Sequence, residues 1–107
     1  MRGELVLVRT TFENTEDAGR LARLALEERL AACVQFHPVS SMYHWQGRLE
    51  TAEEVCWTAK TCPELAQPLM DFIKRHHPYE VPEILVLPVA KCLPEYGAWL
   101  DAETNAI

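Results

Sequence analysis

The chain has 107 residues, enough for one hydrophobic core, and we predict a single domain over residues 1–107. Its composition is 49% hydrophobic and 24% charged, which excludes a disordered or collagen-like chain. The net charge of −6 and the ten scattered basic residues exclude an extended phosphate-binding surface, so nucleic acid is not an expected partner.

The beginning of the sequence carries no recognisable targeting signal. Residues 1–8 contain an apolar run that is far too short to span a membrane, and Arg9 follows it in place of a cleavage site. We therefore expect a cytoplasmic protein without a membrane partner. The four cysteines form no C-x-x-C pair, which excludes a zinc ribbon, and in the cytoplasm they are expected to be free thiols.

The first half of the chain predicts a strand, a helix and a second strand. Residues 5–11 are rich in β-forming residues. Asn14 is a good helix N-cap, and the apolar residues between 18 and 26 recur at helical spacing, so a helix should end near residues 28–30. A strand over residues 31–36 is expected to be interrupted at His37 and Pro38, because proline removes a ladder donor, and to resume over 41–45.

A long hairpin follows this strand. Gln46 and Gly47 predict a tight turn, because glycine readily takes a positive φ. The return strand is expected over residues 55–60. The acidic residues that precede it, Glu50, Glu53 and Glu54, suggest an exposed and irregular middle of the hairpin.

The second half predicts a helix, a strand and a last short helix. Pro68 lies within the second helical pattern, so we predict a helix that begins late, with Pro68 in its first turn. Pro78 ends this helix. Residues 83–87 predict a buried strand that stops at Pro88, and Pro94 opens the final helix.

This order contains two strand-helix-strand halves in tandem, which is typical of the ferredoxin-like split βαβ arrangement. Right-handed crossovers place both helices on one face of a four-stranded antiparallel sheet. We therefore predict an α+β fold with an extended hairpin and an appended C-terminal helix.

The other face of this sheet is expected to need a cover. Six strand residues are expected to make both faces apolar: Val6, Val8, Val34, Phe36, Val55 and Trp57. An open apolar face on so small a domain requires burial. A homotrimer, in which the long hairpins reach neighbouring subunits, would supply it.

Five segments in chain order resemble those of the CutA divalent-cation-tolerance family. They are residues 28–34 (ERLAACV), the Y-x-W-x-G of residues 43–47, the Lys-Thr pair at 60–61, residues 77–84 (HPYEVPEI) with Leu-Pro at 87–88, and residues 94–100 (PEYGAWL). Five motifs in register over nearly the whole chain make a specific match. The resemblance implies a ferredoxin-like subunit, a homotrimer, a cytoplasmic location in a bacterium and a role in tolerance of divalent metals such as copper.

The resemblance also suggests a metal site. Some family members bind copper through a first-strand cysteine and histidines just before the Pro-Tyr pair. Here the histidines are His76 and His77, and the first strand carries Arg-Thr-Thr at 9–11. The resemblance therefore implies weak binding of Cu(II) or another divalent cation at His76 and His77, and no organic cofactor.

Helix geometry restricts such a site. Adjacent helical residues point about 100° apart, so a shared ion requires fraying of the helix at Pro78 or a ligand from a neighbouring subunit. Glu80 and Glu83 are available oxygen ligands. In the alternative interpretation, one histidine caps the helix C-terminus and the other is solvated.

Five further residues are candidates for a cleft or a subunit contact: Tyr43, Trp45, Lys60, Tyr79 and Glu83. A buried Glu83 would need a partner such as Lys60, and such pairs often line functional clefts. Trp45 at the hairpin tip is more typical of an interface anchor than of a ligand stack. The alternative function is a sensory trimer or an enzyme whose small-molecule ligand lies in intersubunit clefts.

The sequence lacks the residues that other functions of this fold require. Phe-Glu-Asn-Thr at 12–15 has no metallochaperone C-x-x-C, and residues 56–59 lack the basic and aromatic pattern of an RNA-recognition strand. No glycine-rich anion loop follows Arg9, and no nucleophile set with its base can be assembled. We therefore expect a protein that is not an enzyme.

Overall fold

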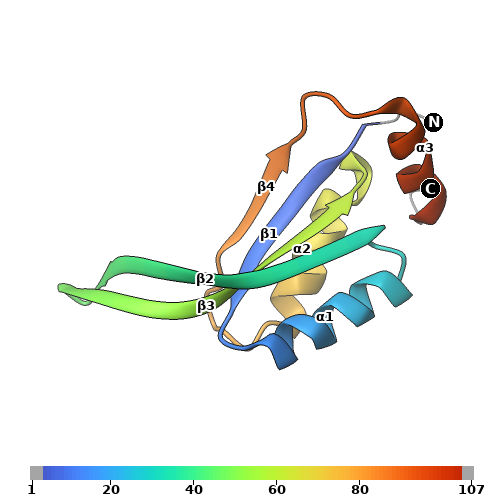
Figure 1. Ribbon diagram of the computed structural model, residues 1–107. Coiled ribbons are helices and arrows are strands. Elements are labelled where there is room, and N and C mark those ends of the chain that lie inside the picture. Colours follow the sequence, from blue (N-terminus) through green and yellow to red (C-terminus); the bar gives the residue numbers. More distant parts are fainter. Residues whose placement is uncertain (1–3, 105–107) are drawn as a thin grey trace.

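The computed structural model describes residues 4–104 and shows one four-stranded antiparallel sheet with helices (Figure 1). The elements are β1 (Val6–Phe12), α1 (Thr15–Glu27), β2 (Cys33–Trp45), β3 (Arg48–Thr61), a 3-10 turn (Pro63–Leu65), α2 (Ala66–His76), β4 (Ile84–Pro88) and α3 (Pro94–Glu103). The strand order is β2-β3-β1-β4. The predicted α+β, ferredoxin-like fold with an extended hairpin and a C-terminal helix is confirmed.

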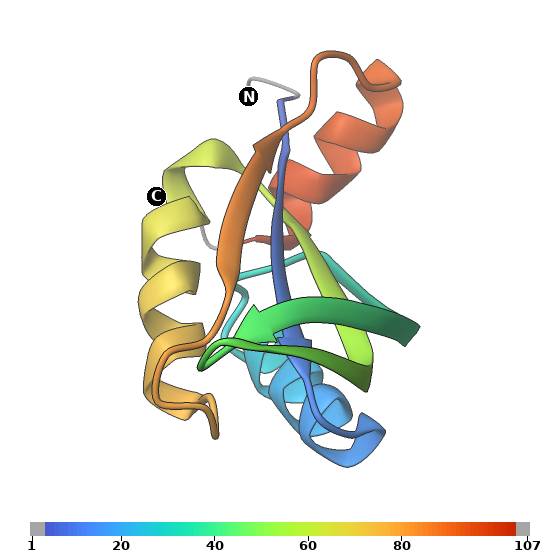
Figure 2. The ribbon, with the colours of Figure 1, turned by 90° about the vertical axis from the view of Figure 1, so that its left-hand side faces the viewer.

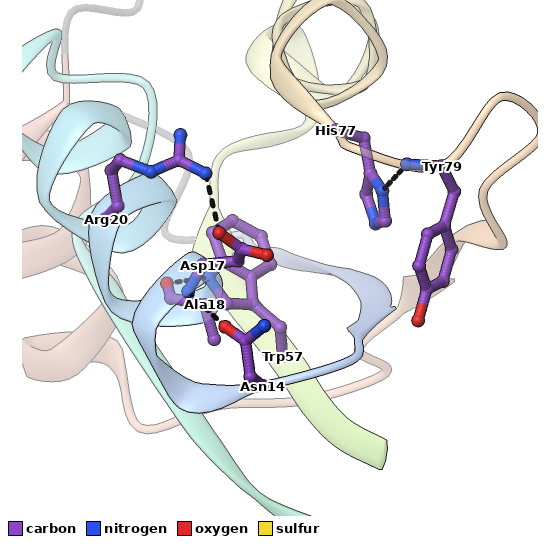
Figure 3. Close-up of polar contacts among 7 residues, drawn as sticks. All are labelled: Asn14, Asp17, Ala18, Arg20, Trp57, His77 and Tyr79. Carbon is purple, nitrogen blue, oxygen red and sulfur yellow. Dashed lines mark hydrogen bonds and ion pairs between the residues drawn. The ribbon is translucent and has the colours of Figure 1, made fainter. Parts of the chain in front are cut away.

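The two crossover helices, α1 and α2, pack on one face of the sheet. Val8, Phe12, Trp57 and Ala59 on this face are fully buried against them. The Trp57 indole N–H donates a hydrogen bond of 3.0 Å to the carbonyl oxygen of Ala18 in α1 (Figure 3). This bond satisfies the one polar atom of a large buried side chain, so the ring contributes its full apolar area to the core.

Helix α1 begins where the sequence indicates. The Asn14 side-chain oxygen accepts a hydrogen bond of 2.8 Å from the backbone N–H of Asp17, which satisfies one free donor of the first turn (Figure 3). Asp17 also forms an ion pair of 2.9 Å with Arg20. After the helix, Arg29 takes a left-handed conformation with φ of 60° and turns the chain toward β2.

Helix α2 begins late, as predicted. The 3-10 turn ends at Leu65, α2 starts at Ala66, and Pro68 is its third residue. A proline in the first turn costs little, because its missing N–H would have no partner within the helix. Leu69, Phe72 and Ile73 then face the core.

The expectation of two apolar sheet faces was wrong. The register pairs Val34 with Ala59 and Ala59 with Val8, so these side chains share one face. The same alternation puts all six residues on the helix-covered face: Val6, Val8, Val34, Phe36, Val55 and Trp57.

The opposite face is mixed rather than apolar. It carries Leu7, Arg9, Thr11, Cys33, Gln35, Cys56, Thr58, Lys60, Leu85 and Leu87. Arg9 donates from Nε to the Thr58 hydroxyl oxygen at 3.2 Å. This face therefore gives no general hydrophobic argument for a cover.

The hairpin is more regular than predicted. β2 runs through His37 and Pro38 without a bulge, because it is an edge strand that pairs on one side only and tolerates a missing N–H. β3 runs without a break through the three glutamates at 50, 53 and 54, since each has a partner on β2. The tight turn is confirmed, with positive φ at Gln46 and Gly47.

The hairpin also projects beyond the rest of the sheet. β1 pairs with β3 only over residues 55–61, so residues 48–54 of β3 have β2 as their single partner. The subunit is accordingly elongated, with extents of 47 × 26 × 20 Å, and Figure 1 shows the hairpin extending away from the helices.

The last strand and helix lie at the other margin of the sheet. β4 was predicted to be buried, but Leu85 is 47% exposed and Val86 38% exposed in the single chain, because β4 is an edge strand that pairs only with β1. Figure 2 shows α3 on the side of β1 opposite to α2. Leu100 of α3 packs with Leu5, Cys62 and Leu65 in a second cluster.

Trp57→Phe should test the bond between the sheet and α1. The variant removes the indole hydrogen bond to the Ala18 carbonyl and creates a small cavity in the core, so we expect a loss of about 2 kcal/mol of unfolding free energy per subunit. Urea unfolding at fixed protein concentration measures the loss. Trp99→Phe, at a 43% exposed position, is the matched control and should cost about 0.5 kcal/mol or less. Equal losses in the two variants would contradict the assignment.

Candidate functional site

His77 connects the end of α2 to the end of β1. It is the C-cap residue of α2 and is only 8% exposed. Its Nδ1 accepts a hydrogen bond of 3.1 Å from the backbone N–H of Tyr79, which can only donate. Nε2 must therefore carry the proton, and it donates to the Thr11 carbonyl oxygen at 2.8 Å. Figure 3 shows the contact between the His77 ring and the Tyr79 backbone.

The packing of the His77 ring also favours its neutral form. The ring stacks on Phe12 with 4.4 Å between centroids and an interplanar angle of 7°, and the Tyr79 ring lies 4.8 Å away. Burial lowers the pKa of His77 from its ordinary value of 6.5, against the smaller opposing effects of the Thr11 carbonyl and Asp17. The imidazole is therefore a neutral structural link between two elements.

His76 has a different environment from its neighbour. Its side chain is exposed, and its ring contacts Phe72 one turn earlier at 4.5 Å. The structure thus leaves His76 solvated, while both ring nitrogens of His77 are already used. A metal ion bound by His77 would have to replace one of its two hydrogen bonds.

No larger ligand set is preformed around these histidines. Within residues 4–104, no group of three or more His, Cys, Asp or Glu side chains is placed to hold a metal ion. The metal site at His76 and His77 therefore stays a prediction. The alternative interpretation expected one solvated histidine and one that caps the end of the helix. His76 is the solvated one, but the His77 ring forms hydrogen bonds with Thr11 and Tyr79 rather than with the last carbonyl groups of α2.

A groove of about 920 Å³ opens where the hairpin leaves the sheet. One wall belongs to the hairpin, with residues Ser41, Met42, Tyr43, Trp45 and Glu54. The other wall is the loop between α2 and β4, with residues Tyr79, Glu80, Val81 and Glu83, and Thr11 contributes from the end of β1. The groove joins segments that are far apart in the sequence.

Strand alternation explains the hairpin wall. The register pairs Ser41 with Ala52 and Tyr43 with Glu50, so Ser41, Tyr43 and Trp45 share one face of the hairpin, and Glu54 shares it as well. The loop wall is fixed at its beginning, because the Tyr79 backbone N–H is bound to His77. A pair of hydrogen bonds at the end of α2 therefore helps to set the width of the groove.

The structure brings together four of the five predicted cleft residues, namely Tyr43, Trp45, Tyr79 and Glu83. The fifth, Lys60, lies elsewhere. In the sheet register Lys60 is the partner of Leu7, and Leu7 is in turn the partner of Leu87. The Lys60 Nζ lies 5.6 Å from the centre of the Tyr96 ring of α3. Within one subunit Lys60 and Glu83 do not form the expected pair, because Glu83 is exposed and precedes β4 at the other end of the sheet.

Sequence reasoning missed Glu54 as a groove residue and treated Glu80 only as a possible metal ligand. The signal for Glu54 was the two-residue period of the hairpin, which places it on the same face as Tyr43. That signal requires the register, and the expectation of an irregular hairpin hid it. Burial raises the pKa of Tyr79, and the nearby carboxylates of Glu54 and Glu13 raise it further.

Comparison with known proteins gives the family of the chain. The sequence model of the CutA1 divalent ion tolerance protein matches residues 6–103. The chain belongs to the CutA family. The divalent-cation tolerance protein CutA of Salmonella newport is 43% identical over 100 residues, which cover 92% of this chain and 87% of that protein.

Solved CutA structures have the same fold. CutA1 from Oryza sativa superimposes with a TM-score of 0.92 at 34% identity, covering 97% of this chain and 96% of that chain. The periplasmic divalent cation tolerance protein CutA from Archaeoglobus fulgidus gives a TM-score of 0.89 at 33% identity, covering 92% of this chain and 97% of that chain. In this CutA chain, no helix among residues 4–104 is long and apolar enough to cross a membrane.

His77 should make the stability of this CutA protein depend on pH. Well above pH 6.5 the ring is neutral in both the folded and unfolded states. As the pH falls below 6.5, the unfolded chain takes up a proton that the folded ring resists, so unfolding becomes easier. We expect a loss of about 1 kcal/mol or less per subunit between pH 7.5 and 5.5, measured by urea unfolding.

His77→Gln is the matched variant for this measurement. Glutamine retains a donor and an acceptor but does not titrate, so its stability should change less over the same pH range. An equal pH dependence in the variant would show that other groups are responsible.

Proposed function

We propose that this protein is a homotrimeric divalent-cation tolerance protein that binds Cu(II) or a related divalent cation weakly and catalyses no reaction. The observation that carries the proposal is the CutA1 family match over residues 6–103, together with relatives named for divalent-cation tolerance. A cytoplasmic location is part of the proposal. It is supported by Cys33, Cys56 and Cys62, which are thiols as expected in a reducing compartment.

The exposed apolar residues of the projecting hairpin support self-association. Leu49 is 63% exposed and Met42 68% exposed, on a hairpin that packs against no helix of its own subunit near the tip. Side chains of this size on an extended arm are typical of a surface that another subunit covers. The mixed open sheet face gives less support than the hairpin does.

The trimer should be visible in solution. Sedimentation or light scattering at micromolar concentration should give three times the subunit mass of 12.2 kDa. Leu49→Glu introduces a charge at the hairpin tip and should lower the average mass or shift dissociation to at least tenfold higher concentration. Leu26→Glu, on the exposed side of α1, is the control and should leave the mass unchanged. A monomer of the unmodified chain at micromolar concentration would refute this part of the proposal.

The structure favours His76 over His77 as the histidine that meets a metal ion first. His76 is exposed at the end of α2, and imidazole is a suitable ligand for copper. His77 can add its Nδ1 only if the Tyr79 N–H bond breaks. That cost is one physical reason for weak binding.

Calorimetric titration with Cu(II) should separate the two histidines. Affinity should fall at least tenfold in His76→Ala, and less in His77→Gln. His44→Ala removes an exposed hairpin histidine and should bind as the unmodified protein does. Saturable binding that all three variants retain would place the metal away from His76 and His77. In the source cells, gene disruption should lower the copper concentration that stops growth.

A further inference from the structure

A cysteine and a histidine lie opposite each other on β3 and β2. In the sheet register Cys56 is the direct partner of His37, so both side chains project from the face of the sheet that α1 and α2 leave open. Directly opposite residues of an antiparallel pair have Cβ atoms about 4.5–5.5 Å apart. The pairing of the two strands therefore holds a thiol and an imidazole next to each other.

Neither side chain has a partner that it would have to give up for a ligand. Cys56 is a free thiol of intermediate exposure, and His37 is exposed on an edge strand. Among residues 4–104, no hydrogen bond, ion pair or ring contact involves either side chain. His77, by contrast, uses both of its ring nitrogens to hold the fold together. The pair of Cys56 and His37 is thus open to a ligand at no cost in existing contacts.

The two ligand atoms suit a soft metal ion. Thiolate sulfur favours Cu(I) and Zn(II), and imidazole nitrogen also suits both metals. Bonds from such an ion to sulfur and to imidazole nitrogen are about 2.3 and 2.0 Å long. An ion between the two side chains therefore needs the sulfur and the nitrogen about 4 Å apart, a separation that directly opposite strand residues can supply.

The number of ligands distinguishes between these ions. Zn(II) in structural sites is almost always four-coordinate. In the part of the chain that the structure describes, no third His, Cys, Asp or Glu side chain completes a metal-binding group. Cu(I) is satisfied by two ligands in a line. Glu54 lies two residues before Cys56 on the same face, and its negative charge favours a cation there without joining the pair.

We infer that Cys56 and His37 bind one Cu(I) ion per subunit in a two-coordinate site on the open face of the sheet. The Cys56 thiol releases its proton to solvent and its sulfur donates an electron pair to the ion, while the neutral His37 ring donates the lone pair of one nitrogen. The oxidation state of the copper does not change.

This site is distinct from both sites described above. Neither Cys56 nor His37 is among the residues that line the groove beside the hairpin. The proposed Cu(II) ligand, His76, belongs to α2 and takes no part in the pair. The inference does not rest on the proposed function, so either can fail while the other holds.

The first test is an anaerobic titration of the assembled protein with Cu(I), in competition with a coloured Cu(I) chelator. Cys56→Ser should lower the affinity about a hundredfold and His37→Leu about tenfold, because thiolate is the stronger ligand. The double variant should bind at most about twofold more weakly than Cys56→Ser, since the two ligands act on one ion. Losses that simply multiply would show that the two residues act separately and would overturn the pair.

Cys33 and His44 provide matched controls. Cys33 lies on the same face of the sheet, but its partner in the register is Lys60, so this thiol has no imidazole opposite it. His44 is an exposed hairpin histidine whose partner is Leu49. Cys33→Ser and His44→Leu should each change the Cu(I) affinity by less than about threefold. A loss in Cys33→Ser equal to that in Cys56→Ser would show that thiols bind without regard to their surroundings, and would overturn the site.

A substitution that supplies a different soft ligand separates coordination from structure. Methionine and leucine are similar in size, but only methionine carries a thioether sulfur, which binds Cu(I). His37→Met should therefore retain most of the affinity that His37→Leu loses. Both variants are checked for an unchanged oligomeric mass and urea midpoint. Equal Cu(I) affinity in these two variants would show that His37 is not a ligand and would overturn the inference.

X-ray absorption of the Cu(I)-loaded protein identifies the ligands directly. We expect two-coordinate copper with one sulfur and one nitrogen neighbour, at one ion per subunit, and the same spectrum in His76→Ala. Two or more sulfur neighbours would assign the ion to several thiols. One ion for each three subunits would assign it to a site shared between copies. Either result would overturn the inference.

Discussion

The two hydrogen bonds of the His77 ring hold three parts of the molecule together. They join the end of α2, the end of β1 and the start of the loop that leads to β4. Because a ring with one donor and one acceptor satisfies both partners only when neutral, the contact fixes the protonation of the histidine as well as its position. The placement of the groove wall follows from this contact, and so does the difference between His76 and His77.

The sheet has one part that α1 and α2 cover and one part, the end of the β2–β3 hairpin, that projects beyond them. Along β1 the side chains alternate between a face buried under α1 and α2 and a face of mixed polarity. Beyond Phe12 the hairpin has no third strand and no helix beneath it, so the same alternation produces two exposed faces. Tyr43 and Trp45 lie on one of these faces and Leu49 on the other.

Local signals in the sequence predicted the elements well, and contacts between distant segments explain the errors. Asn14, Gly47 and Pro68 affect only the few residues next to them in the chain. The helix start, the tight turn and the late start of α2 could therefore be predicted from the sequence. The face on which Val34 lies depends on its register with β3, and no residue near it reveals that register. The prediction that Lys60 and Glu83 pair also depended on the strand register, which places them at opposite ends of the sheet within one subunit. The structural role of His77 needed the position of Thr11, which is 66 residues away.

Pro38 has a consequence for the outer edge of β2. An unpaired strand edge presents a row of N–H and C=O groups on which a second chain can add, and such edges are where sheets aggregate. A proline in the middle of the strand removes one donor from the backbone while the register to β3 continues undisturbed. Any strand that docked along all thirteen residues of β2 would find the row interrupted. Pro38 therefore disfavours edge-to-edge pairing along the whole of β2 and leaves its pairing with β3 intact.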